Sequence, residues 1–370
     1  MRKTILFIHP VNSTFVERDK KILSERYELS SHFYRPEKNI FRFFREIWKI
    51  KYLLIRSRGR VSVIYCWFVD YHSVLPVLFG KLLGIKTILI IGGYDAVCLP
   101  EIRFGIFCSH FFRRSCAKLS YRYADYLCPV DASLVTSSYA YLRAEENEEN
   151  EQQNKKRAII GFKYFVNKFQ AEVKVIPTGY DVSYWQRHGH ETKTEQVIAV
   201  AAISDRRRFL LKGCDLLFAV AEKLPEIPFI IVGFTESYLR EIKQSIPENV
   251  SCERNYSSEK VRELYAKSKV IAQFSLSEGL PNSLCEAMLC ECVPVGSAVG
   301  GIPFAIGDCG YVLGKRDIEQ AADLIGKALK SDVSLGERAR IRISEFFPEK
   351  KRRDQLFQLI EEALSDRIRV

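Results

Sequence analysis

The chain has 370 residues, which is enough for about two domains. With 47% hydrophobic and 12% aromatic residues it has the composition of a globular protein, and no segment reaches the about 18 apolar residues that span a bilayer. A net charge of +11 favours an anionic partner, such as nucleic acid, a membrane surface or a phosphorylated substrate. The 11 scattered cysteines form no paired C-x-x-C motifs, which predicts reduced thiols rather than disulfides or zinc ligands.

The first half of the chain alternates short apolar runs with helical segments, as a βαβ series does. The run Thr4–His9 is followed by charged residues, which predicts a first strand and not an export signal, in a protein that is cytoplasmic or peripheral on the inner face of the membrane. Further strands are expected over Arg60–Phe68, Thr87–Ile91, Tyr126–Val130 and Val173–Pro177, and helices from Thr14 and over Ser73–Leu83. Residues 145–157 are charged and of low complexity, which predicts a mobile surface insert.

A second series begins after the predicted interdomain linker, which consists of the turn Thr178–Asp181 and a polar stretch at 188–195. Strands are expected over Gln196–Ile203, Phe229–Val232, Val270–Leu276, Val293–Gly296 and Tyr311–Leu313, and helices over Gly213–Lys223, Ser257–Ala266, Asn282–Cys290, Ile318–Ser331 and Pro348–Leu364. We therefore predict an α/β fold of two doubly wound Rossmann-like domains facing a cleft. The domains are residues 1–181 on the acceptor side and 182–347 on the nucleotide-sugar side, and the helical segment 348–370 packs back on the first domain.

The stretch Phe274–Ala287, FSLSEGLPNSLCEA, combines a strand end, a Gly/Pro loop and a helix start. Asn282 or Ser283 is suited to cap this helix. The unpaired N–H groups and the positive dipole end of a helix start suit a phosphate. Glu286 in the first helical turn is placed to accept hydrogen bonds from ribose hydroxyls, with Glu278 in the loop before it. Alternatively, Glu286 only stabilises the helix dipole and Glu278 is a solvated loop residue. This stretch alone does not separate ligand binding from these structural roles.

Four segments of the second half follow one another in a characteristic order. They are LLKGCDLL at Leu210–Leu217, IIVG at Ile230–Gly233, LYAKSKVIAQFSLSEGLPNSLCEAM at Leu264–Met288 and VPVGSAVGGIP at Val293–Pro303. Together they resemble the donor-binding domain of the retaining glycosyltransferases of family 4, the glycogen-synthase-like and mannosyltransferase-like group with the GT-B fold. VIPTGYD at Val175–Asp181 is similar to the interdomain turn of that family, and the two glutamates eight residues apart match its paired-glutamate motif.

The resemblance implies a nucleotide-sugar donor, such as a UDP- or GDP-hexose, and no cofactor. Glu286 would hold the ribose, Glu278 would contact the transferred sugar, and Lys212 with an arginine before it would hold the diphosphate. The residues implied to bind nucleotide and phosphate are Arg208, Lys212, Ser283, Leu284 and Glu286, and those implied to bind the sugar are Glu278, Leu280 and Asn282. Arg208 is the favoured one of three consecutive arginines, for which a solvated basic loop is the alternative.

A departing diphosphate has to be stabilised as the anomeric bond breaks. Metal-dependent transferases bind the cation through an Asp-x-Asp pair, and this chain contains none. We therefore expect cationic side chains and helix N-termini to supply the stabilisation without a metal. Glu278 is the catalytic candidate on the donor side. On the acceptor side, Asp95 in the turn Gly92-Gly93-Tyr94-Asp95 and His72 are the catalytic candidates. Each has a structural alternative, as a turn aspartate and as a buried histidine.

Two N-terminal stretches, Asn39–Arg60 and Ile102–Arg122, mix basic with aromatic residues. Amphipathic helices of this kind lie on anionic membranes, whereas ordinary helices with one face on a sheet are the alternative. Nucleic acid is less favoured as a partner, because the chain contains no nucleic-acid-binding fold motif.

The leading functional hypothesis is transfer of a sugar to a sugar or lipid-linked acceptor with retention, in cell-surface glycan or glycolipid synthesis. Two alternatives stay open. One is another GT-B nucleotide-sugar enzyme, such as an epimerase. The other is a non-catalytic basic protein that binds membranes or nucleic acid on the same scaffold.

Overall fold

The computed structural model describes residues 2–35, 39–56, 58–137, 141, 159–187 and 192–365. The charged insert predicted at 145–157 and residues 188–191 of the predicted linker lie outside these ranges. The chain divides into two compact units, with a boundary between Thr178 and Gly179. Unit 1 holds the described residues of Met1–Ser137, Arg157–Thr178 and Lys350–Val370, and unit 2 holds those of Gly179–Glu349 together with Tyr141.

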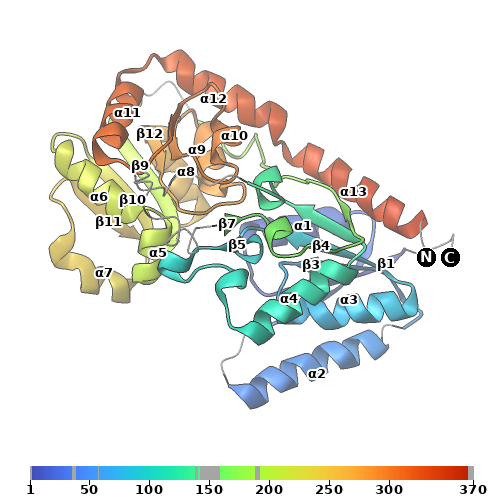
Figure 1. Cartoon of the computed structure of the whole chain (residues 1–370). Coiled ribbons are helices and arrows are strands. Elements are labelled where there is room, and N and C mark those ends of the chain that lie inside the picture. The colour runs from blue at the N-terminus through green and yellow to red at the C-terminus, as the bar shows by residue number, and fades with distance from the viewer. Residues whose placement is uncertain are drawn as a thin grey trace. The chain divides into compact units, whose positions relative to one another are not determined.

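Unit 1 is built on a parallel sheet with the strand order β2-β1-β3-β4-β6-β8 (Figure 1). The strands are β1 (Thr4–His9), β2 (Glu28–Phe33), β3 (Val61–Trp67), β4 (Lys86–Ile91), β6 (Tyr126–Pro129) and β8 (Glu172–Val173), and the helices are α1 (Thr14–Ser24), α2 (Ile40–Arg56), α3 (Tyr71–Leu83), α4 (Phe111–Tyr123) and α13 (Glu349–Ser365). Every residue of β3 is buried, because helices cover both faces of a parallel sheet. The strand order reverses between β1 and β3, which is where such sheets bind ligands at their carboxyl edge.

The connection after β4 folds back on itself. Its short strand β5 (Val97–Cys98) pairs antiparallel with β7 (Ile159–Ile160), and a second antiparallel bridge follows. The fold-back places the Cα atoms of Cys98 and Cys108 5.0 Å apart, and the two residues form a disulfide. The prediction of reduced thiols is therefore wrong for this pair, because a local fold-back between two cysteines leaves no periodic signal in the sequence. The other cysteines are free thiols.

The helix α13 closes unit 1 through a buried ion pair. Arg352 donates from Nε and Nη2 to the two carboxylate oxygens of Asp19 in α1, at 2.6 and 2.7 Å. Its Nη1 donates to the main-chain carbonyls of Ile176 and Pro177, at 2.9 and 2.8 Å. The side chains of the pair are 1% and 0% exposed. Arg352 thus joins α13 to α1 and to the main chain at Ile176 and Pro177, just before the unit boundary.

Unit 2 repeats this architecture with the strand order β11-β10-β9-β12-β13-β14, and its neighbouring strands are parallel. The strands are β9 (Thr194–Ile203), β10 (Phe229–Phe234), β11 (Val250–Arg254), β12 (Ser268–Gln273), β13 (Val293–Ser297) and β14 (Tyr311–Leu313), and the helices are α5 (Arg206–Leu211), α6 (Cys214–Lys223), α7 (Glu236–Ile242), α8 (Ser258–Lys267), α9 (Asn282–Leu289), α10 (Ile302–Ile306), α11 (Ile318–Lys330) and α12 (Val333–Phe346). The prediction of two doubly wound Rossmann-like sheets is confirmed. In unit 2 the order reverses between β9 and β12, so a ligand is expected at the carboxyl ends of these two strands.

None of the helices within the described ranges combines the length and the apolar character needed to cross a membrane.

Candidate functional site

The connection after β9 brings Lys212 to the carboxyl edge of the unit 2 sheet. Asp205 caps α5 by accepting a hydrogen bond from the Arg208 N–H at 3.0 Å, and Lys212 directly follows this short helix. Gly213 then leads into α6 with a φ of +69°. A Cβ at this position would lie 2.1 Å from the carbonyl oxygen of Phe274. Only glycine allows the two loops to approach this closely, and the approach sets the position of Lys212.

A solvated basic loop was the structural alternative for the arginines before Lys212, but these residues do not lie in a loop. Arg206–Arg208 instead form the first turn of α5. The reason is the aspartate cap at Asp205, which starts a helix directly after the strand. Arg208 lies on this helix with an exposed side chain.

Glu278 follows β12 and meets Lys212 at the switch point of the sheet. Lys212 Nζ lies 2.6 Å from Glu278 Oε1, and the two side chains are 20% and 13% exposed. Ser275 Oγ donates to the same oxygen at 2.7 Å and Gln273 Nε2 at 3.2 Å. Within the described part of the chain these hydrogen bonds end at Oε1 and none ends at Oε2. The carboxylate is therefore held in one orientation with its second oxygen available to a ligand.

Two glycines after β13 hold the main chain of the Glu278 loop. Gly300 has a φ of +57°, and a Cβ there would lie 2.0 Å from the Glu278 carbonyl oxygen. Gly301 N donates to the carbonyl oxygen of Gly279 at 2.8 Å. The loops that follow β9, β12 and β13 are thus packed main chain against main chain at one edge of the sheet.

The helix α9 begins beside the Lys212–Glu278 pair. Its cap residue is Pro281, without a capping side chain, so the prediction that Asn282 or Ser283 caps this helix is wrong. Both residues are already helical, and their side chains bond elsewhere. Asn282 Oδ1 accepts from Tyr180 Oη at 2.9 Å, and Ser283 Oγ donates to Gln273 Oε1 at 2.9 Å. These bonds fasten the start of α9 to the end of β12 and to the turn that opens unit 2.

The start of α9 presents main-chain donors to the same edge. The first main-chain hydrogen bond of α9 runs from the N–H of Cys285 to the carbonyl oxygen of Pro281, at 3.2 Å. The N–H groups of Asn282, Ser283 and Leu284 come before it and point out of the helix start, where they and the helix dipole favour an anion. The side chain of Leu284 is buried, so its N–H is the group it offers to a phosphate.

Glu286 was predicted to lie in the first turn of α9. It lies in the second turn, because the helix starts at Asn282. Its side chain is half-buried. Burial raises the pKa of the Tyr265 phenol, and the charge of Glu286 raises it further. Leu280, predicted to contact the sugar, is buried in the loop between Glu278 and α9.

Asp95 of unit 1 is fully buried. Its Oδ1 accepts hydrogen bonds from the N–H groups of Gly92 and Gly93 at 3.1 and 2.9 Å, and its Oδ2 accepts from Val69 N at 3.1 Å. Burial raises the pKa of the carboxyl to about 6, although these N–H groups lower it. The carboxylate ties the glycine turn after β4 to the segment after β3, and it has no exposed surface for a substrate.

His72, the other acceptor-side candidate, is the second residue of α3 and is also fully buried. Its Nε2 lies 2.9 Å from the Trp67 carbonyl oxygen, and since a carbonyl only accepts, this nitrogen carries the proton. The ring stacks on Tyr34, and burial lowers the pKa of the imidazole. Like Asp95, His72 is a buried side chain that holds the main chain at the carboxyl edge of the unit 1 sheet by hydrogen bonding.

A polar cluster at this edge was not predicted. Asp70 caps α3, and Arg113 of α4 donates to both of its carboxylate oxygens, from Nε at 2.9 Å and from Nη2. Beside it, Tyr71 Oη lies 3.0 Å from His110 Nε2, and this second pair is exposed. The available signal was the position of Asp70 and Tyr71 directly after the buried strand β3, where a parallel sheet places its functional groups.

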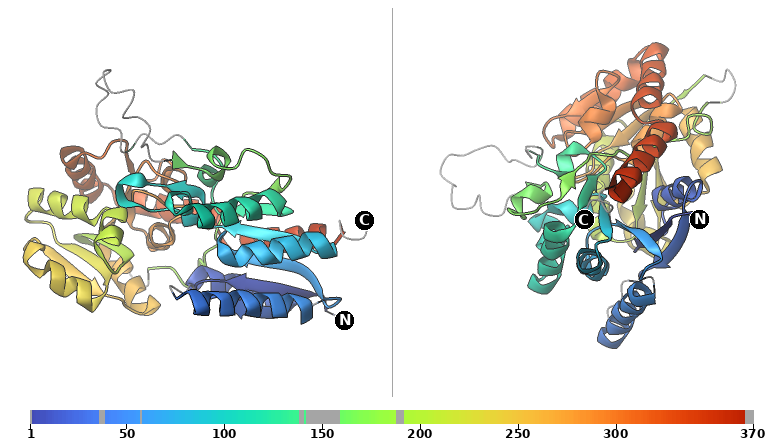
Figure 2. Two further views of the ribbon diagram at one scale, coloured as in Figure 1. Left: turned by 60° about the horizontal axis from the view of Figure 1, so that its bottom comes forward. Right: turned by 90° about the vertical axis from the view of Figure 1, so that its right-hand side faces the viewer.

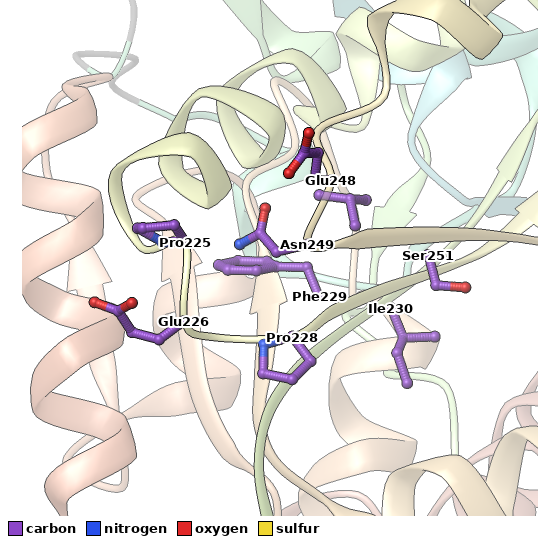
Figure 3. Close-up of a pocket in the computed structure, with 9 residues that line it drawn as sticks. Pro225, Glu226, Pro228, Phe229, Ile230, Glu248, Asn249 and Ser251 are labelled. Atoms are coloured by element: carbon purple, nitrogen blue, oxygen red, sulfur yellow. The ribbon is translucent and has the colours of Figure 1, made fainter.

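A surface pocket of about 540 Å³ lies at the opposite edge of the unit 2 sheet, beside the first residues of β10 and β11 (Figure 3). It is lined by Pro225, Glu226, Pro228, Phe229, Ile230, Glu248, Asn249, Val250 and Ser251. The Asn249 amide nitrogen donates to three carbonyl oxygens at the end of α6 and after it, each at 2.9 Å. The pocket is thus separate from the Lys212–Glu278 edge, and its central amide is already used to hold the loop.

Residues 195–331 match the family model described as glycosyl transferases group 1, and this region contains Lys212, Glu278 and Glu286. Over 146 residues the chain is 32% identical to D-inositol 3-phosphate glycosyltransferase of Mycobacteroides abscessus. That match covers 36% of this chain and 32% of the relative, so it spans about a third of the relative's length.

Two solved structures share the fold over nearly the whole chain. Sucrose-phosphate synthase of Thermosynechococcus elongatus has a TM-score of 0.71 at 15% identity, covering 98% of this chain and 100% of that chain. HepE of Anabaena in complex with UDP and glucose has a TM-score of 0.67 at 14% identity, covering 97% and 100%. The two parallel-sheet units are therefore those of the GT-B glycosyltransferase fold.

Proposed function

We propose that this chain is a retaining glycosyltransferase related to family 4, which moves a hexose from a nucleotide-sugar donor to a sugar or lipid-linked acceptor. The observation that carries the proposal is the meeting of Lys212 and Glu278 beside the start of α9. They meet at the switch point of the unit 2 sheet, inside the region similar to glycosyl transferases group 1. The UDP and glucose bound to HepE of Anabaena support a nucleotide-sugar as the donor class.

In this proposal the donor diphosphate lies against the N–H groups at the start of α9 and against Lys212. An ammonium group has three donors, so Lys212 can keep Glu278 and still bind a phosphate oxygen. Arg208 adds a second cation from α5. Glu286, four residues after the start of α9, accepts hydrogen bonds from the ribose.

The sugar then lies over Glu278, whose Oε2 is the oxygen outside the internal hydrogen bonds. Leu280 and Asn282 border the same position from the loop and from the start of α9. On unit 1, Asp95 and His72 act by holding the strand-end loops in place, since both are buried. The Tyr71–His110 hydrogen bond is exposed, and we propose that this pair contacts the acceptor.

Transfer requires the bond between the anomeric carbon and the diphosphate oxygen to break as the acceptor oxygen bonds to that carbon, and the proton of the acceptor hydroxyl passes to the departing diphosphate oxygen. Negative charge then grows on the leaving diphosphate. Fixed positive groups aimed at this position stabilise it without reorganising, which is how such groups raise rates. Lys212 and the α9 N–H groups supply this charge in the proposal, so we propose that transfer needs no divalent metal.

Release of nucleotide tests the proposal. The full chain is incubated with UDP-, GDP- and ADP-hexoses, with and without a panel of soluble sugars and lipid-linked sugars. We expect free nucleoside diphosphate to accumulate with one donor only when an acceptor is present, equally with and without EDTA, and to give a product of retained configuration. Conversion of the donor into an isomeric nucleotide-sugar without release would assign an epimerase instead. Loss of release in EDTA would contradict the metal-free site, and an inverted product would contradict retention.

A further inference from the structure

One side of α2 exposes a continuous row of large apolar side chains, which are between 53% and 81% exposed. The row consists of Phe41, Phe44, Trp48, Tyr52 and Ile55. Its members are three or four residues apart, so they lie on one side of the helix. The opposite side, with Ile50 and Leu54 buried, packs against α3. Figure 2 shows α2 on the outside of unit 1, beyond α3.

Positive charge flanks this row. The exposed basic residues of α2 are Arg42, Arg45, Lys49, Lys51 and Arg56. The single acidic residue of the helix, Glu46, faces inward with 2% exposure and accepts a hydrogen bond from Lys49 at 2.6 Å. Lys51 Nζ lies 4.4 Å from the centre of the Trp48 ring. The outer side of α2 is therefore apolar along its middle and basic along its borders.

Phe43, on the side of α2 that faces α3, connects the row to the carboxyl edge of the unit 1 sheet, because its ring centroid lies 5.6 Å from that of Phe44. The Phe43 ring packs on Tyr71 with centroids 5.0 Å apart, and Tyr71 packs on Phe112 with centroids 5.8 Å apart. Phe111 and Phe112, the first residues of α4, are 75% and 57% exposed. The left view of Figure 2 shows α2, α3 and α4 side by side. The apolar surface thus reaches the same edge as the Asp70–Arg113 cluster.

We infer that the outer α2 face, made of this row and its flanking basic residues, docks unit 1 on an anionic lipid bilayer. A bilayer offers an apolar interior for the row and negative headgroups for its borders. A second copy of the face would instead bring like charges together, and nucleic acid offers no apolar interior to a side chain such as Ile55. The membrane docking does not depend on the proposed function. The idea that docking brings a lipid-linked acceptor to the carboxyl edge of unit 1 does rest on the proposed function.

Sedimentation of the full chain with vesicles tests the inference. We expect the chain to bind phosphatidylcholine vesicles that contain phosphatidylglycerol, and to bind less at high salt and on phosphatidylcholine alone. The double variant Phe44→Ser/Trp48→Ser is expected to bind at least about tenfold more weakly, because it removes two large apolar groups from the row. Arg45→Glu/Arg56→Glu is expected to lose at least about tenfold at low salt.

The matched control is Val333→Ser/Ile341→Ser on α12, whose side chains are 61% and 54% exposed and belong to unit 2. We expect it to bind vesicles like the unchanged chain. All variants change exposed residues, and circular dichroism and thermal unfolding confirm that each is folded before its binding is compared.

Several outcomes would overturn the inference. One is that the unchanged chain does not sediment with the anionic vesicles at low salt. Another is that the α2 variants bind the vesicles as tightly as the α12 control does. Binding of a single-stranded oligonucleotide through the same residues, without vesicle binding, would assign nucleic acid instead. A dimer that the α2 variants dissociate, without vesicle binding, would assign a self-association surface. A donor titration on the same preparation separates failure of docking from failure of the proposed function, because the donor residues lie in unit 2.

Discussion

Replacement of Lys212 with alanine is expected to lower the rate of sugar transfer by about 10²–10³-fold, the effect of removing one group that stabilises charge in a transition state. Lys212 Nζ lies 2.6 Å from Glu278 Oε1, so in the proposed site its removal leaves the departing diphosphate with the main-chain donors of α9 and with Arg208. The measurement is the initial rate of acceptor-dependent nucleotide release by the full chain.

The fold should survive this change. The Lys212–Glu278 pair is partly exposed, and Ser275 and Gln273 still donate to Glu278 in its absence, so the loss of stability is expected to be about 1 kcal/mol or less. Lys260→Ala on α8, which removes an exposed lysine paired with Glu263 at 3.1 Å, is the control. A Lys212→Ala chain that transfers sugar as fast as the Lys260→Ala control would show that Lys212 does not bind the leaving group.

Replacement of Arg352 with methionine is expected to destabilise unit 1 by about 3–5 kcal/mol, the cost of breaking a buried ion pair from one side. Asp19 would then stay buried, and of its hydrogen bonds within the described ranges it would keep those from Tyr65 Oη at 2.7 Å and Trp67 Nε1 at 2.9 Å. The carbonyls of Ile176 and Pro177 would lose their donor as well. Urea unfolding followed by circular dichroism measures the change.

The neighbouring Arg353→Met is the matched control, because Arg353 is 37% exposed and its partner Asp354 is 58% exposed. We expect this control to change stability by about 0.5 kcal/mol or less. A second variant, Arg352→Met with Asp19→Leu, should cost less than the sum of the single changes, since it removes both buried charges. If Arg352→Met destabilises no more than Arg353→Met, the pair does not hold α13 on unit 1.

The central strands of both sheets could be predicted because their apolar runs are long. RVSVIYCWF, for example, contains β3, whose residues are all buried. The edge strands β2 and β11 were missed. The β2 sequence ELSSHF has no buried residue, and in VSCER of β11 only Val250 is buried. Most side chains of β2 and β11 are exposed or half-buried, so they carry little of the periodic apolar signal that sequence reasoning depends on.

The sequence could predict those residues of the candidate site that directly follow the carboxyl ends of strands. Lys212 and Glu278 come after strands that are neighbours at the switch point, and the structure places their charged atoms 2.6 Å apart. Burial was not predictable in the same way. Asp95 ends a Gly-Gly-Tyr-Asp turn that reads the same whether its carboxylate faces a substrate or, as here, three main-chain N–H groups. The approach of Gly300 to the Glu278 carbonyl likewise depends on a contact between distant segments.

The most direct test of a nucleotide-sugar site in unit 2 is a calorimetric titration of the full chain with UDP-, GDP- and ADP-hexoses, beside Glu286→Ala and the exposed control Glu263→Ala. At least one donor should bind the unchanged chain and the control with the same affinity. Glu286→Ala should bind it about 10- to 100-fold more weakly, because a charged acceptor of ribose hydroxyls is lost. Absence of binding by every nucleotide-sugar, or equal affinity of Glu286→Ala and the control, would contradict the site.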